Sequence, residues 1–137
     1  MTDYLPWDRS KYTVNVDAMD HEHEALVALM NKLYARHSAG ASSGELERVL
    51  DELGAATVRH FASEERYLES IKYSGLATHK LIHRDLLTKF QAHSATFKRT
   101  RKLDDELFRF LRSWLTAHIQ GIDRKYGAPA GGIAKSA

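Results

Sequence analysis

The sequence contains no cysteine among its 137 residues. Disulfide bonds, iron–sulfur clusters and zinc sites built on thiolates are therefore excluded, and the absence fits a reducing cytoplasm. The sequence also lacks an apolar run of about 18 residues and an N-terminal apolar segment, so we expect a cytoplasmic protein without membrane insertion. Its 20 basic and 18 acidic side chains nearly cancel, which argues against nucleic acid as a partner.

Proline is also scarce, because only Pro6 and Pro129 occur, one near each end. The stretch between them is free to be helical, and its segments have helical periodicity rather than the alternation of strands. Turn signals interrupt it at 40–44, 73–75 and 98–102. The sequence therefore predicts an all-α protein, an up-down-up-down four-helix bundle with a non-helical N-terminal arm. The expected helices are 20–39, 45–71, 76–98 and 104–126. The expected boundaries are an arm packing on the bundle at 1–19, the bundle at 20–126 and a flexible tail at 127–137.

Histidine, in contrast, is abundant, with eight in the chain. Helical side chains three, four and seven residues apart share a face, so each predicted helix turns at least one histidine toward the core. His23 aligns with the apolar Leu26, for example, whereas His21 lies on the wet side. His37 and His93 are predicted to be partly exposed and not to bind a ligand. The polar side chains predicted to face inward are His23, His60, Glu64, His79, His83 and His118.

These inward groups predict a metal centre. A single inward histidine is usually an ordinary core residue, but here that explanation has to succeed repeatedly in one core. An uncompensated buried carboxylate costs several kcal/mol, against a total stability of about 5–15 kcal/mol. A metal centre satisfies all these groups at once. Five histidines and Glu64 are too many for one ion, so we predict two.

The composition of the site indicates which chemistry it favours. Imidazole and carboxylate without thiolate suit iron, zinc or copper. Carboxylate-rich di-iron bundles use Glu-x-x-His motifs, and this chain contains none. The predicted site is therefore rich in histidine and poor in negative charge, which favours holding O2 over breaking it. The same helical geometry places Ile71 at the end of the inward stripe of the second helix, and Glu65 off that stripe.

The motifs resemble those of the hemerythrin family, in particular the single-domain bacterial hemerythrins, from Trp7 to Tyr126. They are MDHEH around His23, HFASEE with His60 and Glu64, HKLIH with His79 and His83, and WLTAHIQGID with His118 and Asp123. The resemblance implies a non-haem centre of two iron ions (Fe2+/Fe3+) with a bridging oxo or hydroxo group, and O2 as its ligand. It assigns one iron to His79, His83 and His118, the other to His23 and His60, and the bridges to Glu64 and Asp123. If both irons are six-coordinate, one position stays open on the iron with two histidines, as end-on O2 binding requires.

Asp123 does not fit simple helical geometry together with His118. The two are five residues apart, about 500° of rotation at 100° per residue, so an ideal α-helix does not stack them. Either the helix widens locally into a π-bulge, as happens at functional sites, or the Asp123 side chain reaches round. Gly121 between them favours a local distortion.

Apolar residues next to the predicted ligands are expected to line an O2 pocket. This expectation rests on their positions and on the family resemblance. A tight apolar pocket excludes water and anions, which would displace the bound peroxide and leave the centre oxidised. The residues are Leu26, Phe61, Trp114, Leu115 and Ile119.

Three functions are compatible with such a site. The leading hypothesis is reversible O2 binding for storage, transport or delivery by a non-enzymatic monomer, with a protein partner for delivery. The second is an O2- or redox-sensing module, for which the basic run at 97–102 and the tail could dock a partner, although the sequence contains no signalling domain. The third is a di-iron oxidase or peroxidase-like enzyme, against which the shortage of carboxylates argues. A mononuclear or zinc-containing bundle is a minor further alternative.

Overall fold

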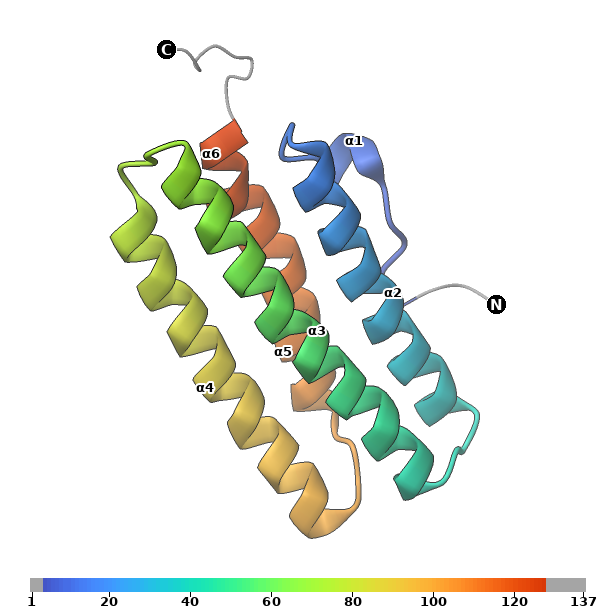
Figure 1. Cartoon of the computed structure of the whole chain (residues 1–137). Helices are drawn as coiled ribbons and strands as arrows, with labels where there is room; N and C mark the ends of the chain where they lie inside the picture. The colour runs from blue at the N-terminus through green and yellow to red at the C-terminus, as the bar shows by residue number, and fades with distance from the viewer. Residues whose placement is uncertain (1–3, 128–137) are drawn as a thin grey trace.

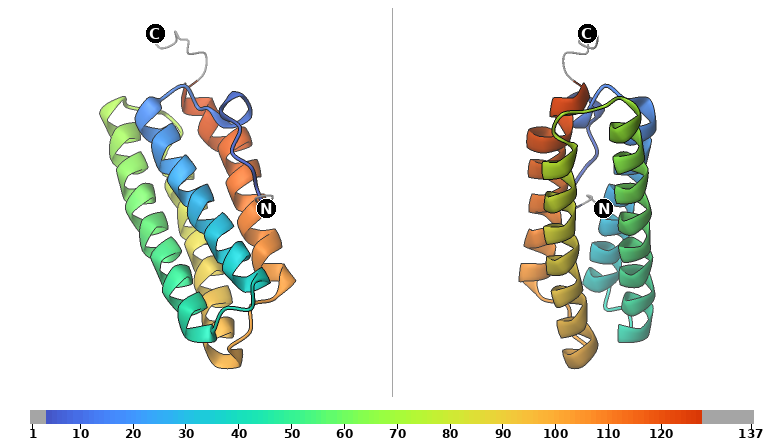
Figure 2. Two further views of the ribbon diagram at one scale, coloured as in Figure 1. Left: turned by 90° about the vertical axis from the view of Figure 1, so that its right-hand side faces the viewer. Right: turned by 60° about the vertical axis from the view of Figure 1, so that its left-hand side comes forward.

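The computed structural model describes residues 4–127, which form an antiparallel bundle of long helices (Figure 1, Figure 2). The predicted all-α, up-down-up-down architecture is confirmed. The segments are α1 (Arg9–Tyr12), α2 (Asp17–Ser38), α3 (Ser43–Ser70), α4 (Leu76–Thr100), α5 (Asp105–Ser113), the π-helix η1 (Trp114–Asp123) and α6 (Arg124–Gly127). The predicted flexible tail lies, from residue 128 on, outside the described residues. None of the helices in residues 4–127 combines the length and the apolar character that a bilayer crossing needs.

Side chains in the connecting segments cap the first turns of α3 and α5. The Ser42 hydroxyl accepts a hydrogen bond from the backbone N–H of Glu45 at 3.2 Å, and Asp104 Oδ1 accepts one from that of Leu107 at 2.9 Å. Each cap satisfies one of the free N–H groups of a first helical turn. α4 ends where Arg101 adopts a left-handed backbone conformation with φ of 61°. The four long helical segments begin and end within three residues of the predicted boundaries.

The N-terminal arm differs from the prediction because it is not wholly non-helical. It contains one turn of helix, α1, and α2 begins at Asp17. Asp20, which is 4% exposed, holds the arm against α2. Its Oδ1 accepts a hydrogen bond from the backbone N–H of Val14 at 2.8 Å, and its Oδ2 accepts one from the Thr13 hydroxyl at 2.6 Å. Leu5 and Val14 of the arm are buried in the core, and the backbone of Leu5 is hydrogen-bonded to the Asn31 side chain of α2, so the arm packs along the bundle.

Replacing Asp20 by alanine is expected to lower the free energy of unfolding by about 1–3 kcal/mol, because two donors of the arm lose their buried acceptor. Asp17→Ala is the control, since the Asp17 side chain is 91% exposed in its pair with Arg9 and such pairs contribute about 0–1 kcal/mol. Urea unfolding followed by circular dichroism measures both variants. Equal losses in the two would contradict the role of Asp20.

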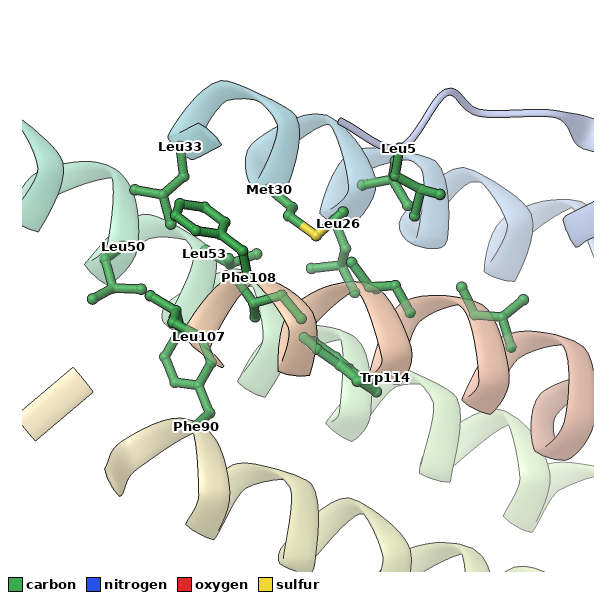
Figure 3. Packing of buried hydrophobic residues seen from close by; sticks show 14 of the residues in the cluster. Leu5, Leu26, Met30, Leu33, Leu50, Leu53, Phe90, Leu107, Phe108 and Trp114 are labelled. Atoms are coloured by element: carbon green, nitrogen blue, oxygen red, sulfur yellow. The ribbon is translucent and has the colours of Figure 1, made fainter. Parts of the chain in front are cut away.

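The two halves of the bundle have different interiors. The half near the α2–α3 turn is a packed apolar core (Figure 3) in which Leu33 and Leu53 are fully buried and Phe90 is 6% exposed. The half near the α3–α4 turn contains the inward histidines and carboxylates. Ile71 was wrongly placed on the inward stripe and is 43% exposed, because α3 ends at Ser70 and Ile71 already lies beyond it.

Candidate metal centre

Seven polar side chains from four helical segments meet in the half of the bundle near the α3–α4 turn. They are His23 from α2, His60 and Glu64 from α3, His79 and His83 from α4, and His118 and Asp123 from η1. All seven are buried. They form two groups, and within each group the metal-binding atoms lie within 4.8 Å of one another. The groups are Glu64, His79, His83, His118 and Asp123, and His23, His60, Glu64 and Asp123. Because both carboxylates belong to both groups, the arrangement suits two neighbouring metal ions.

The two shared carboxylates lie between the histidines. Glu64 Oε1 is 3.0 Å from Nε2 of His79 and 2.9 Å from Nε2 of His83. Asp123 spans the two groups, because its Oδ1 is 3.0 Å from Nε2 of His79 while its Oδ2 is 3.1 Å from Nε2 of His23. Glu64 Oε2 lies 3.6 Å from Nε2 of His23, so both carboxylates are placed between the two groups, as bridges would be.

Several of these buried atoms have no hydrogen-bond partner within residues 4–127. They are both ring nitrogens of His23, Nε2 of His83 and of His118, and both carboxylate oxygens of Asp123. A buried polar group without a partner costs about 1–3 kcal/mol. The concentration of such atoms in one place therefore indicates that a ligand binds there. A donor set of imidazole nitrogens and carboxylate oxygens suits iron, zinc or copper. The residues present therefore fit a centre of two such ions.

Without a metal, the cluster holds protons. Burial lowers the pKa of His23 and of His79, but the carboxylates of Asp123 and Glu64 outweigh burial and raise both values to about 9. Burial raises the pKa of the two carboxyl groups, yet the surrounding histidines hold each pKa below its usual range. Metal binding requires neutral imidazoles, so loading the centre releases these protons.

The metal-free protein is expected to lose stability as the pH rises from about 6.5 through about 9. An unfolded histidine has a pKa of about 6.5, so the raised values of His23 and His79 stabilise the fold fully below that pH, and this contribution disappears as the folded groups deprotonate. Chemical unfolding of chelator-treated protein across this range measures the effect, and the metal-loaded protein is the control. A flat profile for the metal-free protein would contradict the assigned pKa directions.

The last long helix widens around the centre, which decides between the two alternatives predicted for Asp123. η1 is a π-helix of 10 residues between α5 and α6. Its i→i+5 hydrogen bonding brings residues five apart to one face, and His118 Nε2 lies 2.9 Å from Asp123 Oδ1. Gly121, which was expected to favour the distortion, is exposed, and a Cβ there would meet no atom within 4 Å. The π-helix therefore does not depend on room left by a missing side chain.

An apolar pocket adjoins the cluster. Its lining combines the five predicted pocket residues, Leu26, Phe61, Trp114, Leu115 and Ile119, with His23, His60, His118 and Asp123. All five apolar side chains are buried. Both histidines of the two-histidine group reach the pocket, whereas only His118 of the three-histidine group does. The pocket therefore adjoins the side of the centre that has fewer ligands.

Comparison with known proteins agrees with this geometry. Residues 14–129 match the family model described as the hemerythrin HHE cation binding domain. The chain belongs to the hemerythrin family. Among its hemerythrin relatives, the myohemerythrin of Riftia pachyptila is 37% identical over 120 residues, which cover 88% of each chain. The bacteriohemerythrin of Methylococcus capsulatus is 32% identical over 130 residues, which cover 90% of this chain and 94% of the relative.

Solved hemerythrin structures have the same fold. A wild-type hemerythrin crystal structure matches with a TM-score of 0.83 and 29% identity, covering 90% of this chain and 95% of that one. A leucine-to-alanine variant of hemerythrin matches with a TM-score of 0.84 and 28% identity, covering 92% and 96%. The four-helix architecture described above is thus that of the family.

One tyrosine that sequence reasoning missed contacts the hemerythrin centre directly. The Tyr126 hydroxyl, from α6, donates a hydrogen bond to Glu64 Oε2 at 2.6 Å. Burial and the adjacent carboxylates raise the pKa of Tyr126, so the hydroxyl keeps its proton. The available signal was its position three residues after Asp123, but the widened helix made that spacing hard to interpret.

Two glutamates were also missed, although both adjoin predicted ligands in the sequence. Glu22, next to His23, accepts a hydrogen bond from His60. Glu65, which was placed off the inward stripe of α3, is half-buried and accepts one from His83. Both reach a histidine of the neighbouring helix, and a single-helix pattern carries no signal for such a contact.

Proposed function

We propose that this chain binds O2 reversibly at a non-haem di-iron centre. The observation that carries the proposal is the convergence of five imidazoles and two shared carboxylates, without thiolate, beside an apolar pocket. Membership of the hemerythrin family supports it. When bound, the pair of irons supplies the two electrons that O2 takes up and returns.

The ligand groups suggest how the centre is divided. His79, His83 and His118 would hold one iron, and His23 and His60 would hold the other. Glu64 and Asp123, which belong to both groups, would be shared between the two irons. The apolar pocket adjoins the group with two histidines, so a small ligand would reach the centre from that side.

The surrounding residues keep the reaction reversible. Leu26, Trp114, Leu115 and Ile119 are each 5% exposed or less and would exclude water and anions from the pocket. Tyr126 keeps its proton on the hydroxyl and holds Glu64 in place through the 2.6 Å hydrogen bond. The centre therefore accepts a small apolar molecule while charged competitors are kept out.

Binding without turnover fits the donor set better than enzymatic chemistry does. A shell of five histidines and two carboxylates carries little negative charge, and higher oxidation states of iron are stabilised less by it than by a carboxylate-rich shell. The role we propose is O2 storage, transport or delivery by a cytoplasmic monomer that exchanges O2 with a protein partner. O2 or redox sensing remains the second candidate, and the O2 titration described next separates it from reversible O2 binding.

The test is an anaerobic O2 titration of the reduced, desalted protein with an iron count. We expect two irons per chain and a visible charge-transfer band that appears with O2 and disappears on deoxygenation. A centre that oxidises at once, with no reversible band, would favour sensing or oxidase chemistry. Fewer than two irons would contradict the ligand assignment.

A further inference from the structure

In each ligand group, a carboxylate from outside the group accepts a hydrogen bond from one histidine. His60 Nδ1 donates to Glu22 Oε1 at 2.6 Å, and His83 Nδ1 donates to Glu65 Oε2 at 2.8 Å. The imidazoles are buried, with side chains 4% and 2% exposed, while the two carboxylates are 34% and 26% exposed. In both cases Nδ1 is engaged, so Nε2 is left to point at the centre.

The two contacts repeat one arrangement along the bundle. Glu22 is next to His23 on α2 and reaches α3, and Glu65 is next to Glu64 on α3 and reaches α4. Adjacent helical residues are rotated by about 100°. His23 and Glu64 therefore point at the centre, while their neighbours Glu22 and Glu65 point along the side of the next helix. Each of these helices thus supplies a ligand and also holds a ligand of the following helix.

Glu22 is held more firmly than Glu65. The Ser63 hydroxyl donates to Glu22 Oε2 at 2.8 Å, so both oxygens of Glu22 are occupied by α3. Ser63 lies three residues after His60, on the same side of α3. Among the described residues, the one side chain that meets Glu65 in this way is His83.

The two-histidine group relies on the contact between Glu22 and His60. Neither ring nitrogen of His23 has a hydrogen-bond partner within residues 4–127. His23 is placed by packing, with its ring edge-on to that of His60 at 4.6 Å. His60 is therefore the histidine of that group whose orientation a hydrogen bond fixes, and it lines the pocket.

We propose that Glu22, fixed by Ser63, is the positioning residue that orients His60 at the pocket side of the centre. Glu65 does the same for His83 on the other side. The inference deepens the proposed function and rests on it. Outer hydrogen bonds of this kind fix the histidine tautomer, and their loss costs about 10- to 100-fold in metal affinity.

The test uses the iron-loaded full chain and its Glu22→Ala, Glu22→Gln and Glu65→Ala variants. In Glu22→Ala we expect one iron per chain to pass to a chelator about 10- to 100-fold faster while the other is retained. Glu22→Gln keeps an acceptor oxygen and should fall between this variant and the wild type. Glu65→Ala should release the iron of the three-histidine group. The matched control is Glu24→Ala, because Glu24 flanks His23 on its other side and is exposed.

A second readout separates positioning from general loosening. The exchangeable imidazole N–H proton of His60, followed by proton NMR of the metal-loaded protein, should exchange faster in Glu22→Ala and stay unchanged in Glu24→Ala. Ser63→Ala should act in the same direction with a smaller effect, and should add nothing in the Glu22→Ala background, because its action passes through Glu22.

The outcomes distinguish the inference from the proposed function. If wild-type protein binds two irons and Glu22→Ala behaves like Glu24→Ala, the positioning role is overturned while O2 binding stands. If Ser63→Ala and Glu22→Ala are additive, Ser63 does not act through Glu22. Repeating the series with Co(II) tests the positioning role even if iron binding fails. Binding of neither metal by the wild type would overturn both proposals.

Discussion

Replacing Glu64 by alanine is expected to leave the chain unable to hold two irons. Glu64 Oε1 faces His79 and His83 at 3.0 and 2.9 Å, while Oε2 lies 3.6 Å from His23 and 3.8 Å from His60. The substitution therefore removes one ligand from both groups at once. We expect no more than one iron per chain and no O2-dependent band. The loss of affinity should exceed the roughly 10- to 100-fold typical of outer contacts.

An iron count and the visible spectrum after O2 addition measure this effect. Glu69→Ala is the control, because Glu69 is exposed on the same helix and should keep both irons. Circular dichroism shows whether the helices persist, as we expect from the apolar half of the bundle. Two irons with an unchanged band in Glu64→Ala would contradict its role as a bridge.

Replacing Leu115 by alanine is expected to shorten the lifetime of the oxygenated protein by about tenfold or more, which corresponds to about 1.4 kcal/mol in the barrier. Leu115 is 1% exposed and forms part of the pocket wall beside Trp114 and Ile119. Removing its side chain leaves space through which water and anions reach the centre. The variant should also lose about 2–5 kcal/mol of stability from the cavity.

The decay of the O2-dependent band and the rate of azide entry into the oxidised protein measure the pocket's barrier. Leu81→Ala is the matched control, because Leu81 is 60% exposed on α4 and lies outside the pocket lining. It should leave both rates unchanged. If Leu115→Ala oxidises no faster than Leu81→Ala, the pocket does not protect the centre.

Most of the architecture could be predicted from the sequence, because long amphipathic segments with clear turns leave few alternatives for a bundle. The inward direction of His23 or His83 follows from its spacing to apolar neighbours on the same helix. Where another segment determines a residue's environment, the spacing along its own helix gives no information about burial. Asp20 is buried because the arm folds back onto it, and Glu65 is half-buried because His83 of the next helix reaches it.

The π-helix marks the point where helical periodicity itself fails. A rotation of 100° per residue describes an α-helix, and over the five residues from His118 to Asp123 it leaves two solutions that the sequence cannot separate. The choice between these two solutions depends on contacts at the centre. The widened helix brings Asp123 to His118 and Tyr126 to Glu64. The prediction for Ile71 failed for a simpler reason, since α3 ends one residue earlier than the pattern suggested.

The ten-residue π-helix also fixes the register of the end of the last helix. A π-helix is rare and occurs mostly at functional sites. Here its width brings His118 Nε2 to 2.9 Å from Asp123 Oδ1. One residue more or fewer between 114 and 123 would rotate the residues beyond it by about 100°. Tyr126 would then turn away from its hydrogen bond to Glu64, so the length of this segment is tied to the centre.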